Sequence, residues 1–225
     1  MKRILLCILT NILLFSCDNQ EQIHPIIIDP VTPIHLGTET LTTGTYLGFT
    51  IGDSPQTTYT KTQALITSKG LNNLSITHSI YTDLPLVKNT LSLYTSIFLD
   101  EEKGTDSGVQ IYFENNTVKS IYLNSGKKLN RWPNSFPQVS IQLGESVDNL
   151  YSKLERIAAN SVYRKKFERI SLFFKDINKV YDSNMGMSPQ WYFGYSYDIN
   201  KTERVQLNFQ DQKLVSIHVE RYQAR

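Results

Sequence analysis

Hydrophobic and polar positions alternate in two similar stretches of the chain. "VQIYFENNTVKSIYL" (residues 109–123) and "VQLNFQDQKLVSIHV" (residues 205–219) each contain two alternating runs around a short polar turn. Alternation with a period of two predicts strands with one buried face. Asn and Asp tolerate the positive φ that tight turns require. The pattern therefore predicts the same β-hairpin twice.

A second block recurs in the same order and predicts a helix in each copy. "TYLGFTIGDS" (45–54) and "PQVSIQLGES" (137–146) each end in Gly, an acid and a serine. The serine suits the N-cap, and the acid suits the positive end of the helix dipole. Apolar positions then recur at helical spacing. The second copy has Val147, Leu150, Tyr151, Leu154 and Ile157, and the more polar first copy has Pro55, Thr58, Tyr59, Thr62, Leu65 and Ile66, with Gly70 as a left-handed cap.

Strand patterns follow each predicted helix. Residues 74–80 alternate clearly, whereas 167–177 suit either a strand or a helix, and we favour a strand because the first copy is clearer. Each copy then ends in a meander, at 90–99, 109–113 and 118–123 and at 191–197, 205–209 and 214–219. Repetition at this period indicates repeated supersecondary units. We predict an α+β fold of two tandem repeats, each a helix packed on an antiparallel sheet that ends in a three-stranded meander. The repeats span 45–125 and 138–225, joined by a linker at 126–137.

The N-terminus, "MKRILLCILTNILLFSC", is typical of a secretory signal peptide, with a basic start and an apolar run from Ile4 to Phe15. That run is shorter than the roughly 20 residues of a spanning helix, so a retained transmembrane anchor is the weaker interpretation. "LFSC" resembles the lipobox of bacterial lipoproteins. The resemblance implies removal of residues 1–16 and lipidation, such as palmitate, on Cys17. An ordinary signal peptide is the alternative, and Asp18 leaves the membrane and leaflet open.

Residues 17–44 are predicted to be the lipidated cysteine and a flexible tether. The segment contains Pro25, Pro30 and Pro33 and shows no apolar periodicity. Docking of Ile26–Ile28 as an edge strand is the alternative.

Charge and cysteine content narrow the function classes. The chain has 23 Lys and Arg against 21 Asp and Glu, and removal of Lys2 and Arg3 with the signal makes the two counts equal. A balanced charge gives no basis for a nucleic-acid partner. Cys7 and Cys17 are the two cysteines, so the mature domain has no disulfide, thiolate metal site or cysteine nucleophile.

No catalytic or metal motif is present in the sequence. His24, His35, His78 and His218 lack metal-ligand spacing, and there is no GxSxG elbow or Walker loop. Asp83 and Asp176 occupy matching places in the two copies and form a candidate carboxylate pair for a hydrolase, although termination of a strand explains both. We predict no enzymatic activity, no cofactor and no metal.

Aromatic residues are the best candidates for binding. In "WYFGYSY", the side chains of Trp191, Phe193 and Tyr195 share one strand face. They form either core or an exposed surface, where Trp and Tyr are favoured anchors. Trp132 and Phe136, in the linker, either fill the seam between the repeats or stand at the mouth of a groove.

The order of strand, "LGES", helix, "WYFGY" strand and "VQLNFQDQKLVSI" hairpin resembles two families over residues 45–125 and 138–225. These are small envelope lipoproteins of the SmpA/OmlA (BamE) type and the tandem-repeat β-lactamase inhibitory proteins. The resemblance implies a non-enzymatic, membrane-anchored lipoprotein of the cell envelope, at the outer membrane or periplasmic face, that binds another envelope or secreted protein. Inhibitor, immunity factor and assembly accessory remain open as roles. A carbohydrate- or small-ligand-binding lipoprotein is the alternative.

Overall fold

The computed structural model describes residues 32–76 and 80–225, and the predicted signal peptide, Cys17 and the start of the tether lie outside them. The described part is mostly antiparallel sheet, with 43% of residues in strands and 23% in helical turns. The helices are α2 (Pro55–Lys69) and α3 (Leu150–Ala158), and the 3-10 turns are η1 (Leu84–Val87), η2 (Leu91–Leu93), η3 (Val147–Asn149), η4 (Arg164–Phe167) and η5 (Ser183–Met187). The strands are β1 (Ile34–Leu41), β2 (Thr45–Tyr46), β3 (Phe49–Thr50), β4 (Asn73–Ile76), β5 (Ile80–Tyr81), β6 (Tyr94–Asp100), β7 (Val109–Glu114), β8 (Thr117–Leu123), β9 (Lys128–Leu129), β10 (Arg131–Trp132), β11 (Ile141–Gln142), β12 (Arg169–Asp176), β13 (Gln190–Asp198), β14 (Lys201–Gln210) and β15 (Lys213–Gln223).

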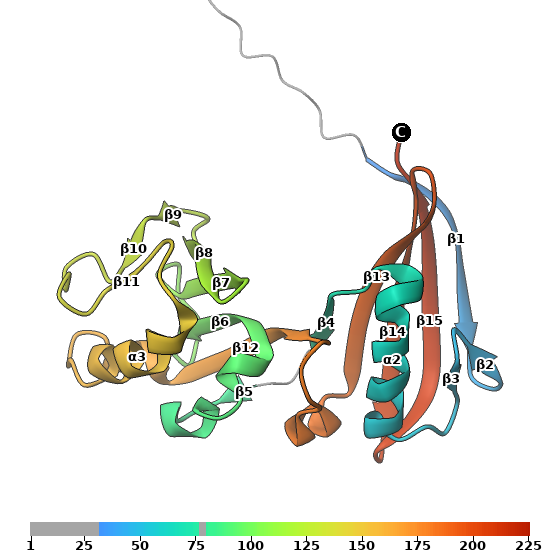
Figure 1. Ribbon diagram of the computed structural model, residues 1–225, viewed down its shortest axis with the longest axis horizontal. Helices are drawn as coiled ribbons and strands as arrows, with labels where there is room; N and C mark the ends of the chain where they lie inside the picture. Colours follow the sequence, from blue (N-terminus) through green and yellow to red (C-terminus); the bar gives the residue numbers. More distant parts are fainter. Residues whose placement is uncertain (1–31, 77–79) are drawn as a thin grey trace, which may run out of the picture. The chain divides into compact units, whose positions relative to one another are not determined.

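One 11-stranded sheet joins both meanders. Its order is β1-β15-β14-β13-β4-β12-β6-β7-β8-β9, with β5 also paired to β12 (Figure 1). The strand after each helix leaves its own repeat: β4 pairs with β13, and β12 pairs with β6. At the centre β4 and β12 pair with each other, with Leu74 opposite Lys175. Strands of the two repeats are therefore interleaved.

The predicted fold class, two tandem helix-on-sheet repeats, is wrong. Helix α2 contacts β13 and β15, which belong to the second repeat. Just before α2, Gly52 N donates to Leu214 O and Leu214 N donates to Asp53 O, both at 2.8 Å. We call α2, β1, β4 and β13–β15 the α2 half.

The second helix shows the same exchange. Gly144 N donates to Val118 O and Val118 N donates to Glu145 O, both at 2.9 Å, so the start of the second helical segment is held on the hairpin of the first repeat. We call α3, β6–β9 and β12 the α3 half. The periodicity of the sequence shows which face of a helix is buried but not which sheet covers that face. A tandem arrangement of self-contained repeats is only the simplest fold compatible with the periodicity.

Local start and stop signals are confirmed. Ser54 Oγ accepts a hydrogen bond from Thr57 N, and Gly70 ends α2 with φ of 67°. In the second copy Ser146 Oγ accepts from Asp148 N but begins the 3-10 turn η3, and the α-helix α3 begins only at Leu150, with Asn149 as its N-cap. The strand favoured over a helix at 167–177 is confirmed, as β12 (Arg169–Asp176). The turn residue Asn116 has φ of 59°, as expected of a tight hairpin turn.

The tether and linker contain more structure than predicted. Residues Ile34–Leu41 form β1, which pairs antiparallel with β15, so a flexible tether is wrong for this stretch. The linker contains β9 and β10. By contrast, the predicted strands at 45–51 and 137–143 shrink to two-residue pairings.

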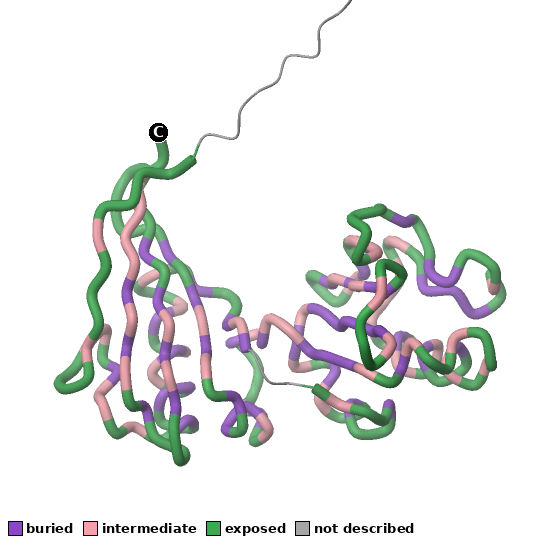
Figure 2. The backbone as a smooth tube through the Cα atoms, turned by 180° about the vertical axis from the view of Figure 1, so that it is seen from behind, coloured by how far each residue is buried: buried purple, intermediate pink, exposed green. Residues whose placement is uncertain are grey.

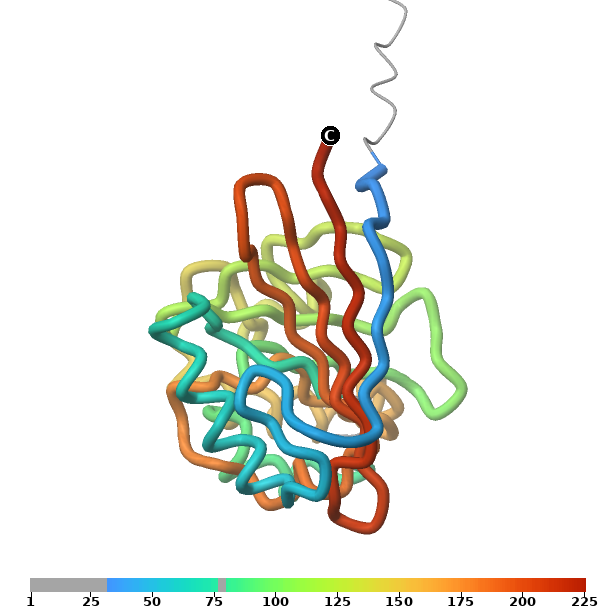
Figure 3. Tube along the Cα trace, turned by 90° about the vertical axis from the view of Figure 1, so that its right-hand side faces the viewer, coloured from blue at the N-terminus to red at the C-terminus, as the bar shows by residue number. Residues whose placement is uncertain are grey.

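Alternation of buried and exposed residues positions the core. Along the strands of the α2 half, buried residues alternate with half-buried and exposed ones, as Figure 2 shows. Figure 3 shows β1 and the C-terminal strands side by side. In each half the helix covers one side of the sheet: α2 contacts β13 and β15, and the buried side chains of α3, Leu150, Leu154 and Ile157, join the same core cluster as Ile111 and Ile121. The other side of the strands is the place to look for a binding surface.

Candidate functional site

The aromatic residues proposed from sequence as binding anchors lie in the core. Trp191 is fully buried, and its Nε1 donates to Met185 O at 3.2 Å. Phe193 and Tyr195 are buried on the same strand face, and Phe193 packs against Phe49 at 5.8 Å between ring centroids. These three side chains do not form an exposed surface, because their strand face lies beneath α2 and the segment before it.

The aromatic side chains of the linker also pack against the core. Trp132 is buried, with its ring edge-on to Tyr163 at 5.9 Å. Phe136 is half-buried and packs against the core. Their packing fits the interpretation that they fill space inside the fold, and neither offers a free ring to a partner.

A different group of aromatic rings forms a partly exposed surface, which we call the aromatic face. Ring centroids are linked in one chain by distances of 6.2–6.5 Å. Its members, in order of contact, are Phe98, Phe173, Phe174, Tyr112 and Tyr122. The last four are half-buried, so a continuous aromatic surface reaches solvent.

Strand register explains why these rings meet. Phe98 of β6 lies opposite Gln110 of β7, which lies opposite Tyr122 of β8. In the next row, Phe173 of β12 lies opposite Ser96, and Ser96 lies opposite Tyr112. Side chains of residues directly opposite or diagonal on one sheet face are within reach of each other. The intervening positions, such as Ile97, Ile111 and Ile121, are fully buried on the other side.

Phe174 joins the aromatic face because of an unusual backbone. Its φ is 49°, a left-handed conformation that is uncommon for a bulky residue. Successive side chains of a regular strand point to opposite faces, yet the rings of Phe173 and Phe174 lie 6.5 Å apart. The conformation therefore places a second ring on the side of Phe173. Strain of this kind, of order 1–3 kcal/mol, is concentrated at functional sites.

Two cations flank the aromatic face. Lys128 lies opposite Tyr122 across β9 and β8, and Arg169 begins β12 on the side of Phe173. Lys128 is exposed and Arg169 half-buried. Among the described residues neither has an ion pair. Positive charge is thus available at both ends of the surface.

The corresponding positions of the α2 half are polar. Tyr192 lies opposite Gln206, which lies opposite His218, and His218 pairs with Thr40 of β1. The side chains of Thr40 and His218 are joined by a 2.8 Å hydrogen bond. The aromatic face is therefore a property of one half and not of the repeated hairpin. The signal in the sequence is the pair of adjacent phenylalanines in "SLFFKD", which a half-buried regular strand does not explain.

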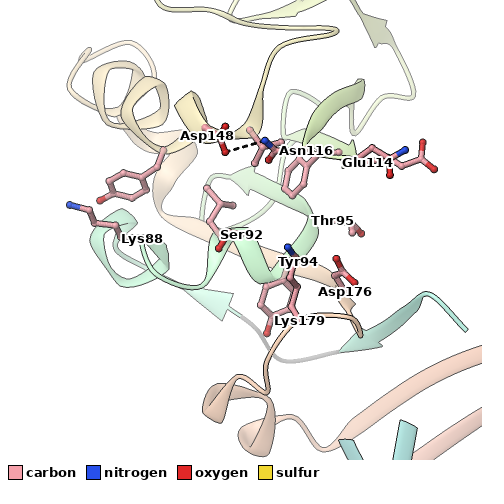
Figure 4. A pocket seen from close by; sticks show the side chains of 14 residues that line it. Lys88, Ser92, Tyr94, Thr95, Glu114, Asn116, Asp148, Asp176 and Lys179 are labelled. Carbon is pink, nitrogen blue, oxygen red and sulfur yellow. Dashed lines mark hydrogen bonds between the residues drawn. The ribbon is translucent and has the colours of Figure 1, made fainter. Parts of the chain in front are cut away.

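A pocket of about 830 Å³ lies elsewhere in the α3 half, beside the β7–β8 turn (Figure 4). Its polar lining comes from five segments: the η1–η2 loop, the start of β6, the β7–β8 turn, the start of the α3 segment and the end of β12. Lys88, Ser92, Glu114, Asn116, Asp148, Asp176 and Lys179 supply polar groups, and Leu91, Phe113, Val147 and Tyr151 supply apolar surface.

The buried charges elsewhere are explained by structural roles. Burial raises the pKa of Glu203, but hydrogen bonds from Tyr195, Tyr46 and Arg221 outweigh burial and hold the pKa below its usual value. Tyr195 and Tyr46 in turn have raised pKa values, chiefly because of burial. This network ties the segment around β2 to β13–β15 and opens into neither the pocket nor the aromatic face.

The positions of Asp83 and Asp176 do not support the hydrolase hypothesis. Asp176 ends β12, and its carboxylate accepts a hydrogen bond from Asn178 N at 2.9 Å, whereas Asp83 is exposed before η1. No hydrogen bond in residues 32–76 and 80–225 joins the two. Within those residues there is also no group of three or more potential metal ligands.

Neither helix in the described part of the chain combines the length and apolar character needed to cross a membrane. Comparison with known proteins gave no match to a family model, a curated protein or a solved structure. Any inference of function therefore rests on the sequence and on the side chains of the described residues.

Proposed function

We propose that this protein is a lipid-anchored lipoprotein of the cell envelope that binds another protein through the aromatic face. The observation that carries the proposal is the continuous chain of rings from Phe98 to Tyr122, of which all but Phe98 are half-buried, with Phe174 held on it by a left-handed backbone. Tyr, Trp and Phe are enriched at protein interfaces, and Tyr is among the residues that most often dominate the binding energy. The signal peptide and lipobox pattern support anchoring through Cys17.

Charge defines the partner's chemistry. Lys128 and Arg169 stand at the two ends of the aromatic face and form no ion pair among the described residues, although Asp100, which lies opposite Arg169, is close to Lys166 at 3.9 Å. A segment with apolar or aromatic residues at its centre and acidic residues on either side is complementary to this arrangement. Complementary charges at the rim speed association and exclude wrong partners. The partner is therefore an acidic-flanked apolar segment of another envelope or secreted protein.

The test is capture of the tagged full chain from cross-linked envelopes. A single protein should co-purify with the wild type and be lost with the double variant Lys128→Glu and Arg169→Glu. Lys127→Glu is the control for Lys128→Glu alone, since it makes the same charge reversal at the neighbouring exposed position. Circular dichroism and thermal unfolding should show all variants folded.

Two outcomes oppose the proposal. If the partner still co-purifies with a variant that combines Phe173→Ala with the two charge reversals, it binds at another surface. If no protein is enriched with the wild type, the protein-binding proposal is contradicted. Anchoring has its own readout: incorporation of labelled palmitate should be lost on Cys17→Ala. A wild-type protein that incorporates no label would contradict lipidation, and this result would not bear on protein binding by the aromatic face.

A further inference from the structure

We propose that the pocket beside the β7–β8 turn binds a small zwitterionic ligand of the amino-acid or short-peptide class. The inference concerns a different surface from the aromatic face and does not depend on the protein-binding proposal. It rests on the internal comparison of the two halves and on the charges that line the pocket.

The comparison shows that the pocket is not a general feature of the repeated hairpin. In the α2 half the turn between β14 and β15 is closed by the loop that contains η5. There Gln212 Nε2 donates to Gly186 O at 2.6 Å, and Phe209 N donates to Pro189 O at 2.7 Å. The loop before the first meander strand thus packs directly on the turn.

The α3 half lacks this closure. Asn116 corresponds to Gln212 in the repeated hairpin, but its Nδ2 donates to Asp148 Oδ1 at 3.1 Å and to Ser146 Oγ at 3.3 Å. Among the described residues, no hydrogen bond joins η1 or η2 to the β7–β8 turn. A cavity of about 830 Å³ lies here instead, lined by the η1–η2 loop on one side and by the β7–β8 turn on another. That volume is within the usual range of small-molecule sites.

Both signs of charge line the cavity. Lys88 and Lys179 have no ion pair with another described residue, although Lys88 lies over the Tyr151 ring at 5.5 Å. Glu114, Asp148 and Asp176 stand on the same lining. Figure 4 shows Asp148 and Asn116 on one side of the opening and Asp176 and Lys179 on another.

The mixture of charges selects the ligand class. A simple anion would meet three carboxylates, and a simple cation would meet two ammonium groups. A ligand with one carboxylate and one ammonium group satisfies both, and its apolar part can lie against Leu91, Phe113 and Val147. Free amino acids and short peptides have this composition, and the volume suits a few residues.

The experiment is isothermal titration calorimetry on the full chain purified in detergent, with trialanine as the probe. Saturable binding is expected. N-acetyl-trialanine and trialanine amide, which each lack one charge, should bind at least about tenfold more weakly, a loss of about 1.4 kcal/mol. Inorganic phosphate and propionate should not compete at equal concentration.

Variants locate the site. Lys179→Met and Lys88→Met should each weaken trialanine binding about tenfold, whereas Lys213→Met, an exposed lysine beside the equivalent turn of the other half, should leave it unchanged. The Lys128→Glu and Arg169→Glu variant should also bind trialanine normally, which separates this site from the aromatic face. No heat of binding, equal binding of the singly charged analogues, or equal loss on Lys213→Met would overturn the proposal.

Discussion

At the scale of single residues, the left-handed backbone of Phe174 places its ring on the aromatic face and lowers the stability of the fold. In the left-handed region the β-carbon of an L residue lies too close to the neighbouring carbonyl oxygen, which destabilises this conformation by roughly 1–2 kcal/mol. Phe174 retains this conformation with its carbonyl accepting a hydrogen bond from Thr95 Oγ1 at 3.1 Å. The ring then contacts Tyr112 at 6.2 Å. Strain that places a ring on a surface suits a contact made with a partner.

The strain can be measured by comparing two truncations at one position. Phe174→Gly and Phe174→Ala both remove the ring, but only Gly adopts positive φ freely. We expect the Gly variant to be more stable than the Ala variant by about 1 kcal/mol, read as the difference in free energy of unfolding in urea. Phe173 lies in regular strand, so there we expect Phe173→Ala to be more stable than Phe173→Gly. If Ala is more stable at both positions, residue 174 is not strained.

Lys175 is a second residue whose energetics follow from its position. It is fully buried, and its Nζ donates to Tyr59 Oη at 2.9 Å and to Asp176 O at 2.8 Å, with no ion pair in the described part of the chain. Burial lowers its pKa from 10.5 to about 8, and the nearby charges of Asp176 and Asp182 limit the change. The charged form is therefore destabilised by the fold.

The lowered pKa of Lys175 predicts how stability changes with pH. Between pH 8 and 10.5 the folded protein has released a proton that the unfolded chain still binds, so stability rises with pH in this window. We expect a gain of about 2 kcal/mol between pH 7.5 and 9.5 in urea unfolding. Lys175→Met should lack that gain. Tyr59 has a raised pKa and opposes folding above pH 10, so the measurement stops below that value. A flat wild-type profile would contradict the lowered pKa.

At the scale of elements, β1 changes where the folded part begins. Without β1, the backbone of β15 from Ile217 to Gln223 would remain paired with β14 but would lose its partner on the other side and become an exposed edge. Residues Arg221 and Glu39 would also lose their 3.1 Å ion pair. The strand therefore acts as part of the sheet and not as part of a tether.

Truncation tests the role of β1. A chain that begins at Gly44, the boundary that the sequence pattern suggests, should unfold at least several degrees below one that begins at Thr32, since each kcal/mol corresponds to about 2–4 °C at this size. It should also show a greater tendency to aggregate in light scattering. Equal melting temperatures would mean that β1 contributes nothing to stability.

The success of sequence reasoning at this scale depends on how local each signal is. Ser54, Gly70 and the Asn115–Asn116 turn are predictable because their chemistry involves neighbours a few residues away. The aromatic face is not, because it is assembled from β6, β7, β8 and β12 and from one residue with left-handed φ. Trp191 is ambiguous between core and surface since alternation gives two faces without saying which one a helix covers. Strand register, which no periodicity specifies, decides each of these cases.

At the scale of the whole molecule, the exchange of helices and strands makes each half depend on both repeats. The α2 half takes β1, α2 and β4 from the first part of the chain and β13–β15 from the second. The α3 half takes β6–β9 from the first and α3 and β12 from the second. Its aromatic face likewise needs Phe98, Tyr112 and Tyr122 from one repeat and Phe173 and Phe174 from the other.

Separation of the repeats tests this dependence. A fragment of residues 32–125 would have β6, β7 and β8 without β12, and α2 without β13–β15. The buried faces of both would be exposed, so we expect little cooperative thermal unfolding for this fragment alone, and likewise for 126–225. When the two are mixed or co-expressed, they should form a one-to-one complex with the circular dichroism of the intact chain, because the contacts between Gly52 and Leu214 and between Gly144 and Val118 join one fragment to the other. Independent cooperative folding of either fragment would contradict the exchanged arrangement and favour self-contained repeats.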